Sequence, residues 1–471
     1  MLRFKIFLTL ILSGTQLFCQ DQCDCKKVVQ NVALEIEANS ASFADQVYLE
    51  KQMESYEKYK SFILDLASLQ QTKIDCIGIV ALYLAYLKDA HQQIYGSQDF
   101  YRFSLSDAAS VQAFFDKHIA YKDLQAHSSE PSLLGKWVLD DGSLTIHIQR
   151  GGEKGRAFTG LLVSSNRDYW KKGAITLEIF EQLDHQLTGV IWSEWLQAQV
   201  GAVKLNEDTL QIGRFHTFYR EEINQQDIAE NQQYEAFQLV ELMDSISYLR
   251  LPTFQYQYVG RIDSIITANH ARLLVTKHLV LDLRGNAGGS DYAYQSLLPY
   301  IMDKREFTEP ITTSIWVSQD NWEGYYEERY DYGVESAQDS LAADGELQEM
   351  ARHIGSFEPI QYHPQILDTV YSYPKQISIL IDENCASTTE SFLMVAGLSD
   401  KVKTYGSPTK GAASYGEWRR IDIPELDSWI SLTQKRFSFL DHDNFELIGI
   451  APDIFLKKKD WSEVVLAGTK N

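Results

Sequence analysis

Cysteine is scarce in this chain, and its spacing does not fit a metal site. The sequence contains five cysteines in 471 residues, without the paired C-x-x-C motifs of a structural zinc site. The glycine-rich stretch at 285–290, GNAGGS, lacks the G-x-G-x-x-G spacing of a dinucleotide-binding loop. We therefore predict no metal and no cofactor.

Positive charge is also in short supply. The chain has 43 Lys and Arg residues against 65 Asp and Glu residues, which gives a formal net charge of −22. Such acidity disfavours binding to nucleic acid and to anionic lipid surfaces. It identifies neither a substrate nor an oligomeric state.

A long hydrophobic run is missing from the N-terminus, where a short one occurs instead. Arg3 and Lys5 precede the apolar stretch Ile6–Leu12, which is too short to span a bilayer. This pattern predicts a signal peptide over residues 1–20 and a secreted or periplasmic protein. Cys19 leaves a lipid anchor to the membrane as an alternative, although Phe18 stands where lipidation signals prefer a small residue.

Four cysteines would remain after export: Cys23, Cys25, Cys76 and Cys385. An oxidising compartment permits a disulfide between Cys76 and either Cys23 or Cys25. Cys385 is the less suitable partner because it lies two residues before a serine of interest, Ser387. The sequence does not decide the connectivity.

The remaining chain is too long for one hydrophobic core, and its composition and hydrophobic pattern change twice along the sequence. Residues 21–125 contain few Gly and Pro residues and predict an N-terminal helical domain. Residues 126–230 predict an inserted antiparallel β module, either a sheet or a small barrel. Helical spacing is seen at Ile77, Val80, Leu84 and Leu87, and strand alternation at Leu144, Ile146, Ile148, Ile175, Leu177 and Ile179. Residues 235–471 mix short buried strands with helices, which is typical of an α/β fold.

Two segments of this last part follow the same plan. In Ile377–Phe392 an apolar strand stops at polar turn residues, and a helix begins with Ser387 at the junction. In Leu279–Gly289 a buried strand ends in the glycine pair Gly288-Gly289. Acyl transfer needs an exposed nucleophile at a sharp turn and backbone N–H donors for the developing oxyanion. The two strand ends would supply both.

The pair of segments closely resembles the C-terminal-processing (tail-specific) serine peptidases, whose signature includes the strand-ending GG and an A-S-x-x-E turn. The resemblance covers about residues 235–471 and implies a crotonase-like (ClpP/crotonase-type) catalytic core. Relatives usually carry a PDZ module before this core, but residues 126–230 show no convincing carboxylate-binding loop. The β module could bind extended peptide or have a purely structural role.

Ser387 falls at the nucleophile position of this resemblance. The turn C-A-S-T-T-E places Glu390 at the expected offset, and a G-x-x-T-x-G segment follows at Gly406–Gly411. The alternative is an ordinary helix N-cap, a common role for serine. The combination with the glycine pair favours the nucleophile.

The general base departs from the better-known branch of these peptidases, in which a lysine follows the second glycine. Alanine occupies that position here, Ala412, and Lys410 lies two residues earlier, about 6.6 Å back along a strand. The chain thus resembles the lysine-less branch that includes the tricorn core protease, which uses histidine. The tripeptide ending in His91 matches the D-G-H-like motif of that branch except for Ala90, and His442 is the rival. An imidazole can accept the serine proton and return it to the leaving amine.

The resemblance also implies the other members of the site. Glu446 fits the terminal pattern E-x-x-G-x-x-P-D and is the candidate acid that orients the imidazole. Its competitors are Asp441, Asp443 and Asp453. The oxyanion hole would combine the N–H of Gly288 or Gly289 with that of Thr388.

The sequence therefore predicts an exported serine endopeptidase with a Ser-His-Glu triad, acting on peptide or protein substrates. The alternative is a non-catalytic peptide- or ligand-binding protein on the same scaffold, as in the retinoid-binding relatives of this family. The departures at Ala90 and Ala412 and the missing PDZ loop keep that alternative open.

Overall fold

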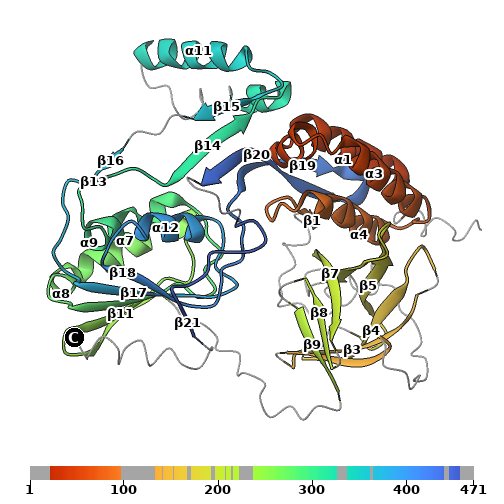
Figure 1. Cartoon of the computed structure of the whole chain (residues 1–471), viewed down its shortest axis with the longest axis horizontal. Coiled ribbons are helices and arrows are strands. Elements are labelled where there is room, and N and C mark those ends of the chain that lie inside the picture. Colours follow the sequence, from red (N-terminus) through yellow and green to blue (C-terminus); the bar gives the residue numbers. More distant parts are fainter. Residues whose placement is uncertain are drawn as a thin grey trace, which may run out of the picture.

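The structure is a computed structural model, and its description covers twelve ranges: 22–96, 133–140, 142–151, 153–166, 171–192, 197–206, 208–213, 216–221, 237–325, 337–360, 364–439 and 445–456. The predicted signal peptide and Cys19 lie outside these ranges, as does His442. Figure 1 shows a body built on a parallel sheet at the left, and helices and a β-barrel at the right.

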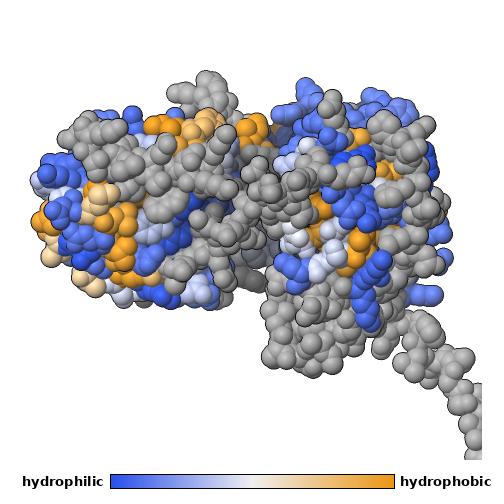
Figure 2. Space-filling model, turned by 90° about the horizontal axis from the view of Figure 1, so that it is seen from below, coloured by the Kyte–Doolittle hydropathy of each residue, from blue (hydrophilic) through white to orange (hydrophobic). Residues whose placement is uncertain are grey.

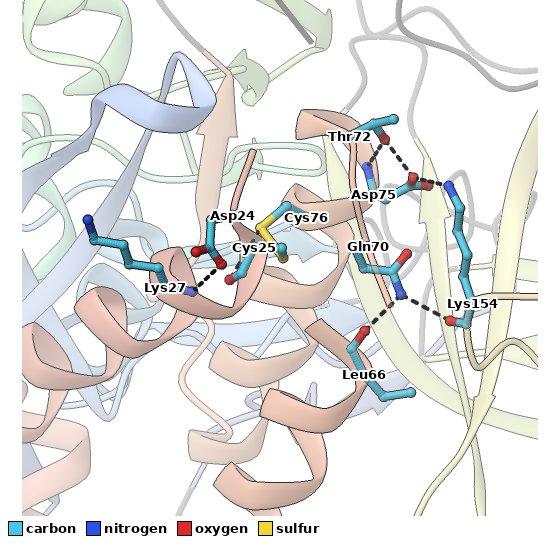
Figure 3. Close-up of a disulfide and its surroundings, with 9 residues drawn as sticks. All are labelled: Asp24, Cys25, Lys27, Leu66, Gln70, Thr72, Asp75, Cys76 and Lys154. Carbon is cyan, nitrogen blue, oxygen red and sulfur yellow. Dashed lines mark hydrogen bonds and ion pairs between the residues drawn. A yellow bond between two sulfur atoms is a disulfide. The ribbon is translucent and has the colours of Figure 1, made fainter. Parts of the chain in front are cut away.

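The N-terminal described residues are helical. The helices are α1 (Cys25–Asn39), α2 (Ala41–Phe43), the π-helical η1 (Ala44–Leu49), α3 (Met53–Ser68), α4 (Lys73–Leu84) and the 3-10 turn η2 (Ala85–Leu87). Asp24 caps α1 by accepting from the N–H of Lys27, and Thr72 caps α4 in the same way. A disulfide joins Cys25 at the start of α1 to Cys76 in α4 (Figure 3), which selects one of the two predicted pairings.

The predicted β module is a closed antiparallel barrel. Its strands are β2 (Gly135–Leu139), β3 (Leu144–Arg150), β4 (Phe158–Ser165), β5 (Ile175–Glu181), β6 (Leu187–Trp192), β7 (Ala198–Asn206), β8 (Thr209–Ile212) and β9 (His216–Arg220). Alternate residues such as Ile146, Ile148 and Leu177 fill its core. The alternation in the sequence thus correctly predicted an antiparallel β unit.

A buried ionic network attaches the barrel to α4. Arg156 binds both Asp75 of α4 and Glu178 of β5, and Lys154 also reaches Asp75. Trp192 donates its indole N–H to Glu178 at 2.8 Å. Because these charges are paired on all sides, the contact can be buried without leaving an isolated charge.

The second sheet carries the two strand ends singled out above. Its order is β10-β11-β12-β17-β18-β21, and all neighbours are parallel except β10 and β11. The bounds are β10 (Gln238–Met243), β11 (Ile246–Arg250), β12 (His278–Asp282), β17 (Gln376–Ile381), β18 (Val402–Gly406) and β21 (Ile454–Phe455). The helical elements around it include η3 (Tyr256–Tyr258), α7 (Val259–Ala268), α8 (His270–Leu273), η4 (Asp291–Leu297), α9 (Leu298–Ile301) and α12 (Thr388–Ala396). Helices and a parallel sheet make this part α/β; the crotonase-like arrangement implied by the resemblance stays a prediction.

A third sheet connects the helices with the parallel-sheet body (Figure 1). Its members are β1 (Ile94–Gly96), β20 (Ser428–Phe439), β14 (Ile311–Trp316), β15 (Phe357–Ile360) and β19 (Tyr415–Ile423). Smaller elements nearby in sequence are β13 (Glu306–Phe307), α11 (Ala337–Ala351), β16 (Gln365–Ile366) and η5 (Pro424–Leu426). Ile430 and Leu432 of β20 share a core with the helices, so the C-terminal part of the chain helps to build the N-terminal region.

Hydrophilic and apolar residues alternate over the described surface seen in Figure 2, with apolar patches between blue areas. No helix within the described ranges is long and apolar enough to cross a membrane.

Candidate active site

Ser387 lies where β17 gives way to α12. The apolar residues of β17 are buried in the parallel sheet, and the chain turns sharply before the helix begins at Thr388. Ser387 has φ 55° and ψ −123°, a conformation that residues other than glycine rarely adopt. Such strain is held by the surrounding structure and presents the hydroxyl at the tip of the turn.

The glycine pair packs directly against this turn. A Cβ on Gly288 would lie 2.5 Å from the carbonyl oxygen of Ala386 and 2.9 Å from the nitrogen of Thr388, so a side chain could not fit. The N–H of Gly288 donates to Oδ1 of Asn286 at 3.0 Å. Within the described ranges, the N–H groups of Gly289 and Thr388 donate to no recorded partner. These two groups are therefore available to a ligand atom.

His91 reaches Ser387 from the helical region. The turn η2 ends at Lys88 in a left-handed conformation, and the next residues lead into β1. His91 Nε2 lies 3.1 Å from Ser387 Oγ, although the residues are 296 positions apart. The backbone is held by Ser431 of β20, which contacts the carbonyl of His91.

Two buried carboxylates, those of Asp89 and Glu446, accept hydrogen bonds from the backbone around His91 and not from its ring. Oδ1 of Asp89 accepts from the N–H of His91 at 3.0 Å, and Oδ2 accepts from Oγ1 of Thr433 at 2.6 Å. Oε1 of Glu446 accepts from the N–H of Ala90 at 2.7 Å. His91 Nδ1 is buried, and a hydrogen bond between the ring and the backbone of Tyr415 acts to raise the pKa of His91.

Glu446 also holds the other side of the site. Its Oε2 accepts from the N–H groups of Ala413 at 3.2 Å and Ser414 at 2.8 Å. The carboxylate thus ties the histidine segment to the chain that follows the G-x-x-T-x-G motif. The direct contact with the imidazole that the triad hypothesis implies is absent between these described residues, and the role of Glu446 stays a prediction.

Glu390 makes a second clamp, between the turn of Ser387 and the same motif. Its fully buried carboxylate accepts from the N–H of Ser387 at 3.0 Å and from Oγ1 of Thr409 at 2.5 Å. It also accepts from the N–H groups of Gly411 and Ala412, each at 2.8 Å. Glu390 therefore fixes the strained turn relative to the neighbouring loop.

The electrostatics of the site follow from burial and close charges. Burial lowers the pKa of His91, while the Asp89 carboxylate raises it and the Lys410 cation lowers it. Burial and the Asp89 charge raise the pKa of Glu446 to about 8. An imidazole with a lowered pKa is neutral at neutral pH and can accept a proton.

The competing residues occupy other places. Burial lowers the pKa of Lys410, and the carboxylates of Glu390 and Glu446 counteract this effect. Asp453 accepts from the N–H and Oγ1 of Thr404, where it joins β21 to β18. Asp441, Asp443 and His442 lie outside the described residues.

Sequence reasoning missed the positioning contacts of Asp89 and Glu390. Both stand in motifs described above, the tripeptide ending in His91 and the A-S-x-x-E turn. Each carboxylate binds one N–H close by in the sequence, that of His91 for Asp89 and that of Ser387 for Glu390. Their other partners lie far away in the sequence: Thr433, Thr409, Gly411 and Ala412. The S-x-x-E spacing of Ser387 and Glu390 is a capping-box signal that could have identified the nearer contact, whereas no local pattern identifies the distant partners.

Residues 245–456 match the model of peptidase family S41. The chain therefore carries a serine peptidase domain of family S41. The matched residues include Ser387, the glycine pair and Glu446, whereas His91 lies outside them. No curated protein sequence matches the chain.

Three solved structures illustrate what the S41 protein resembles in shape. Mature CPAF is 15% identical with a TM-score of 0.48, and the match covers 92% of this chain and 93% of that one. The photosystem II D1 C-terminal processing protease is 13% identical with a TM-score of 0.37, covering 92% and 94%. The tricorn protease is 12% identical with a TM-score of 0.35, covering 92% and 34%. With TM-scores this low, the family assignment rests on the sequence match.

Proposed function

We propose that this S41 protein is an exported serine endopeptidase in which Ser387 is the nucleophile and His91 the general base. The observation that carries the proposal is the 3.1 Å separation of Ser387 Oγ and His91 Nε2 at a strained turn. A neutral imidazole at this distance can take the hydroxyl proton as Oγ attacks the peptide carbonyl. Export rests on residues 1–20 alone.

The tetrahedral intermediate would place its oxyanion against the N–H groups of Gly289 and Thr388. These donors are preorganised by the backbone and need no rearrangement as charge develops. The imidazolium then returns its proton to the leaving amine, and an ester joins Ser387 to the acyl half of the substrate. A water molecule, deprotonated by His91, hydrolyses that ester and restores the free serine.

In this scheme the carboxylates act mainly on position and charge. Glu446 holds the backbone of Ala90 and Asp89 holds the backbone of His91, so both orient the imidazole. Asp89 also stabilises the positive charge that forms on the ring. Glu446 is the third member of the proposed triad. Peptide or protein chains are the proposed substrates.

Labelling with a fluorophosphonate probe tests this proposal, because the probe reacts with activated serines. We expect the wild-type protein to be labelled and Ser387→Ala to be unlabelled. Ser391→Ala is the matched control, since it removes a hydroxyl one turn further along the same helix, and it should be labelled like the wild type. Absence of labelling in folded wild-type protein would contradict the peptidase proposal and favour the non-catalytic binding protein.

A further inference from the structure

A cavity of about 390 Å³ lies behind the histidine segment, where three parts of the chain meet. Its lining includes the end of α4, residues 88–90 and 92–94, and part of the barrel, chiefly β7 with Gly213 and His216. Lys410 and Leu447 close it on the side of the S41 domain. The barrel therefore takes part in a hollow next to the candidate site.

The charge of this cavity is opposite to that of the whole chain. Lys88 and Lys410 contribute cations to its lining, His216 adds an imidazole, and Asp89 is the acidic residue there. The carboxylates of Glu390 and Glu446 act on Lys410, which leaves Lys88 as the cation that they do not balance. Both oxygens of Asp89 are already engaged by His91 and Thr433. In a chain of net charge −22, a hollow with this balance favours an anionic group.

Side-chain amides add hydrogen-bond donors to the same lining. Gln92, Gln93, Gln197 and Gln199 all border the cavity, and Gln197 Nε2 donates to Gln93 Oε1 across it from the barrel at 3.0 Å. Gln92 is 4% exposed, and its Nε2 has no partner among the described residues. A buried donor without a partner is costly, so an acceptor atom of a ligand would be stabilised there.

The cavity also adjoins the proposed catalytic groups. Ala90 borders it directly before His91, and the N–H of Lys410 donates to the carbonyl of Cys385, two residues before Ser387, at 2.7 Å. Apolar side chains such as Leu84 and Ile94 can contact methylene groups. A side chain reaching this hollow could therefore belong to a peptide held at Ser387.

We propose that the cavity binds the carboxylate of an acidic side chain of the peptide substrate, with the barrel forming one wall of this specificity site. The proposal rests on the peptidase function proposed above. Replacing the side chain of Lys88 removes its charge and leaves Glu390 and Glu446 in place. The contact of Lys88 with η2 is made by its backbone, so the substitution does not remove it.

The test compares peptides that are identical except for Glu or Gln at one position near the cleaved bond. Both ends are blocked by acetylation and amidation, so that the side chain carries the only variable charge. We expect one position at which wild-type kcat/KM is about fivefold higher for Glu than for Gln, the size of a partly exposed ion pair. Lys88→Gln should reduce this ratio to about one, Lys88→Arg should retain it, and added salt should weaken it.

Lys51→Gln is the matched control. Lys51 is an exposed lysine with φ 57°, close to the 46° of Lys88, and it also follows a helical segment. It does not line the cavity. The Glu/Gln ratio should be unchanged in this variant. An unchanged ratio in Lys88→Gln, no Glu preference at any position, or a carboxylate preference that needs a free peptide C-terminus would each overturn the proposal.

Failure of the proposed function gives a different result. In that case the wild type hydrolyses neither peptide, and binding of the fluorescent Glu and Gln peptides is measured by anisotropy instead. Tighter binding of the Glu peptide that disappears in Lys88→Gln would support the carboxylate site in a protein without peptidase activity. Equal binding of the two peptides would contradict the proposed carboxylate site as well.

Discussion

Two serine–histidine pairs of nearly the same geometry occur in the part of the chain that the structure describes. His91 Nε2 lies 3.1 Å from Ser387 Oγ, and His278 Nε2 lies 2.9 Å from Ser378 Oγ. Burial lowers the pKa of both histidines. Distance and pKa alone therefore do not distinguish them.

The backbone around the two serines differs completely. Ser378 lies inside β17 between two parallel neighbours, paired with Val280 on one side and Lys403 on the other. Its hydroxyl is fully buried and its backbone belongs to the sheet. Ser387 stands beyond the end of the same strand at positive φ, beside the N–H groups of Gly289 and Thr388, which bind no other group in the described ranges. A serine–histidine contact becomes chemically useful where a substrate carbonyl and an oxyanion can also be accommodated.

The largest expected effect separates the two serines. Ser387→Ala should lower peptide hydrolysis by about 10⁴-fold or more, because the proposed nucleophile is removed. Ser378→Ala should leave kcat/KM within about twofold and lower the free energy of unfolding by about 1 kcal/mol, since it removes one buried hydrogen bond. Activity assays and urea unfolding of both variants measure this contrast, and equal loss in the two would contradict it.

The histidines should differ almost as strongly. His91→Gln removes the proposed base and should reduce kcat by about 10³- to 10⁴-fold. His278→Gln should keep activity within about twofold while lowering the melting temperature, because its side chain serves the core. Circular dichroism must show His91→Gln to be folded for the comparison to hold. Full activity of this folded variant would assign the base elsewhere.

Glu446 should have a smaller effect, which depends on the substitution. Glu446→Gln retains an oxygen acceptor for the N–H of Ala90 and should cost about tenfold in kcat. Glu446→Ala loses every clamp contact and should cost about 10²-fold, because the histidine segment is no longer fixed. The equivalent loss in both variants would mean that charge, and not position, is the contribution of Glu446.

The smallest effect concerns Lys410. Its cation lowers the pKa of His91, so Lys410→Met should raise that pKa and move the acidic limb of kcat/KM to higher pH. Activity at pH 8, where the imidazole is neutral in both proteins, should change by about twofold or less. A full pH profile of the variant measures the shift, and a shift toward lower pH would be the wrong sign.

Features of the fold that depend on neighbouring residues could be predicted from the sequence. The strand, turn and helix around Ser387 and the strand ending in the glycine pair follow local hydrophobicity and turn chemistry, so they were predicted. The alternation in residues 144–179 likewise predicted antiparallel strands, and the structure closes them into a barrel. These features depend on neighbours in the sequence.

Features that depend on distant contacts were not predicted. Ile430 and Leu432 read as part of the C-terminal block, yet they pack against the N-terminal helices because β20 pairs with β1. The clamps of Glu390 and Glu446 act on backbone N–H groups, which leave no trace in residue identity. The cavity beside Lys88 arises only where barrel, helix and S41 domain meet.

The central claim is that a neutral His91 from the helical region activates Ser387, and the pH dependence of inactivation by a fluorophosphonate tests it most directly. Because burial lowers the pKa of His91, the second-order rate constant should rise with a midpoint below the ordinary value of about 6.5 and then level off. His91→Gln should abolish this rise and lower the plateau by about 10³-fold. A rate that increases only at alkaline pH and is lost in Lys410→Met, while His91→Gln reacts like the wild type, would contradict the account.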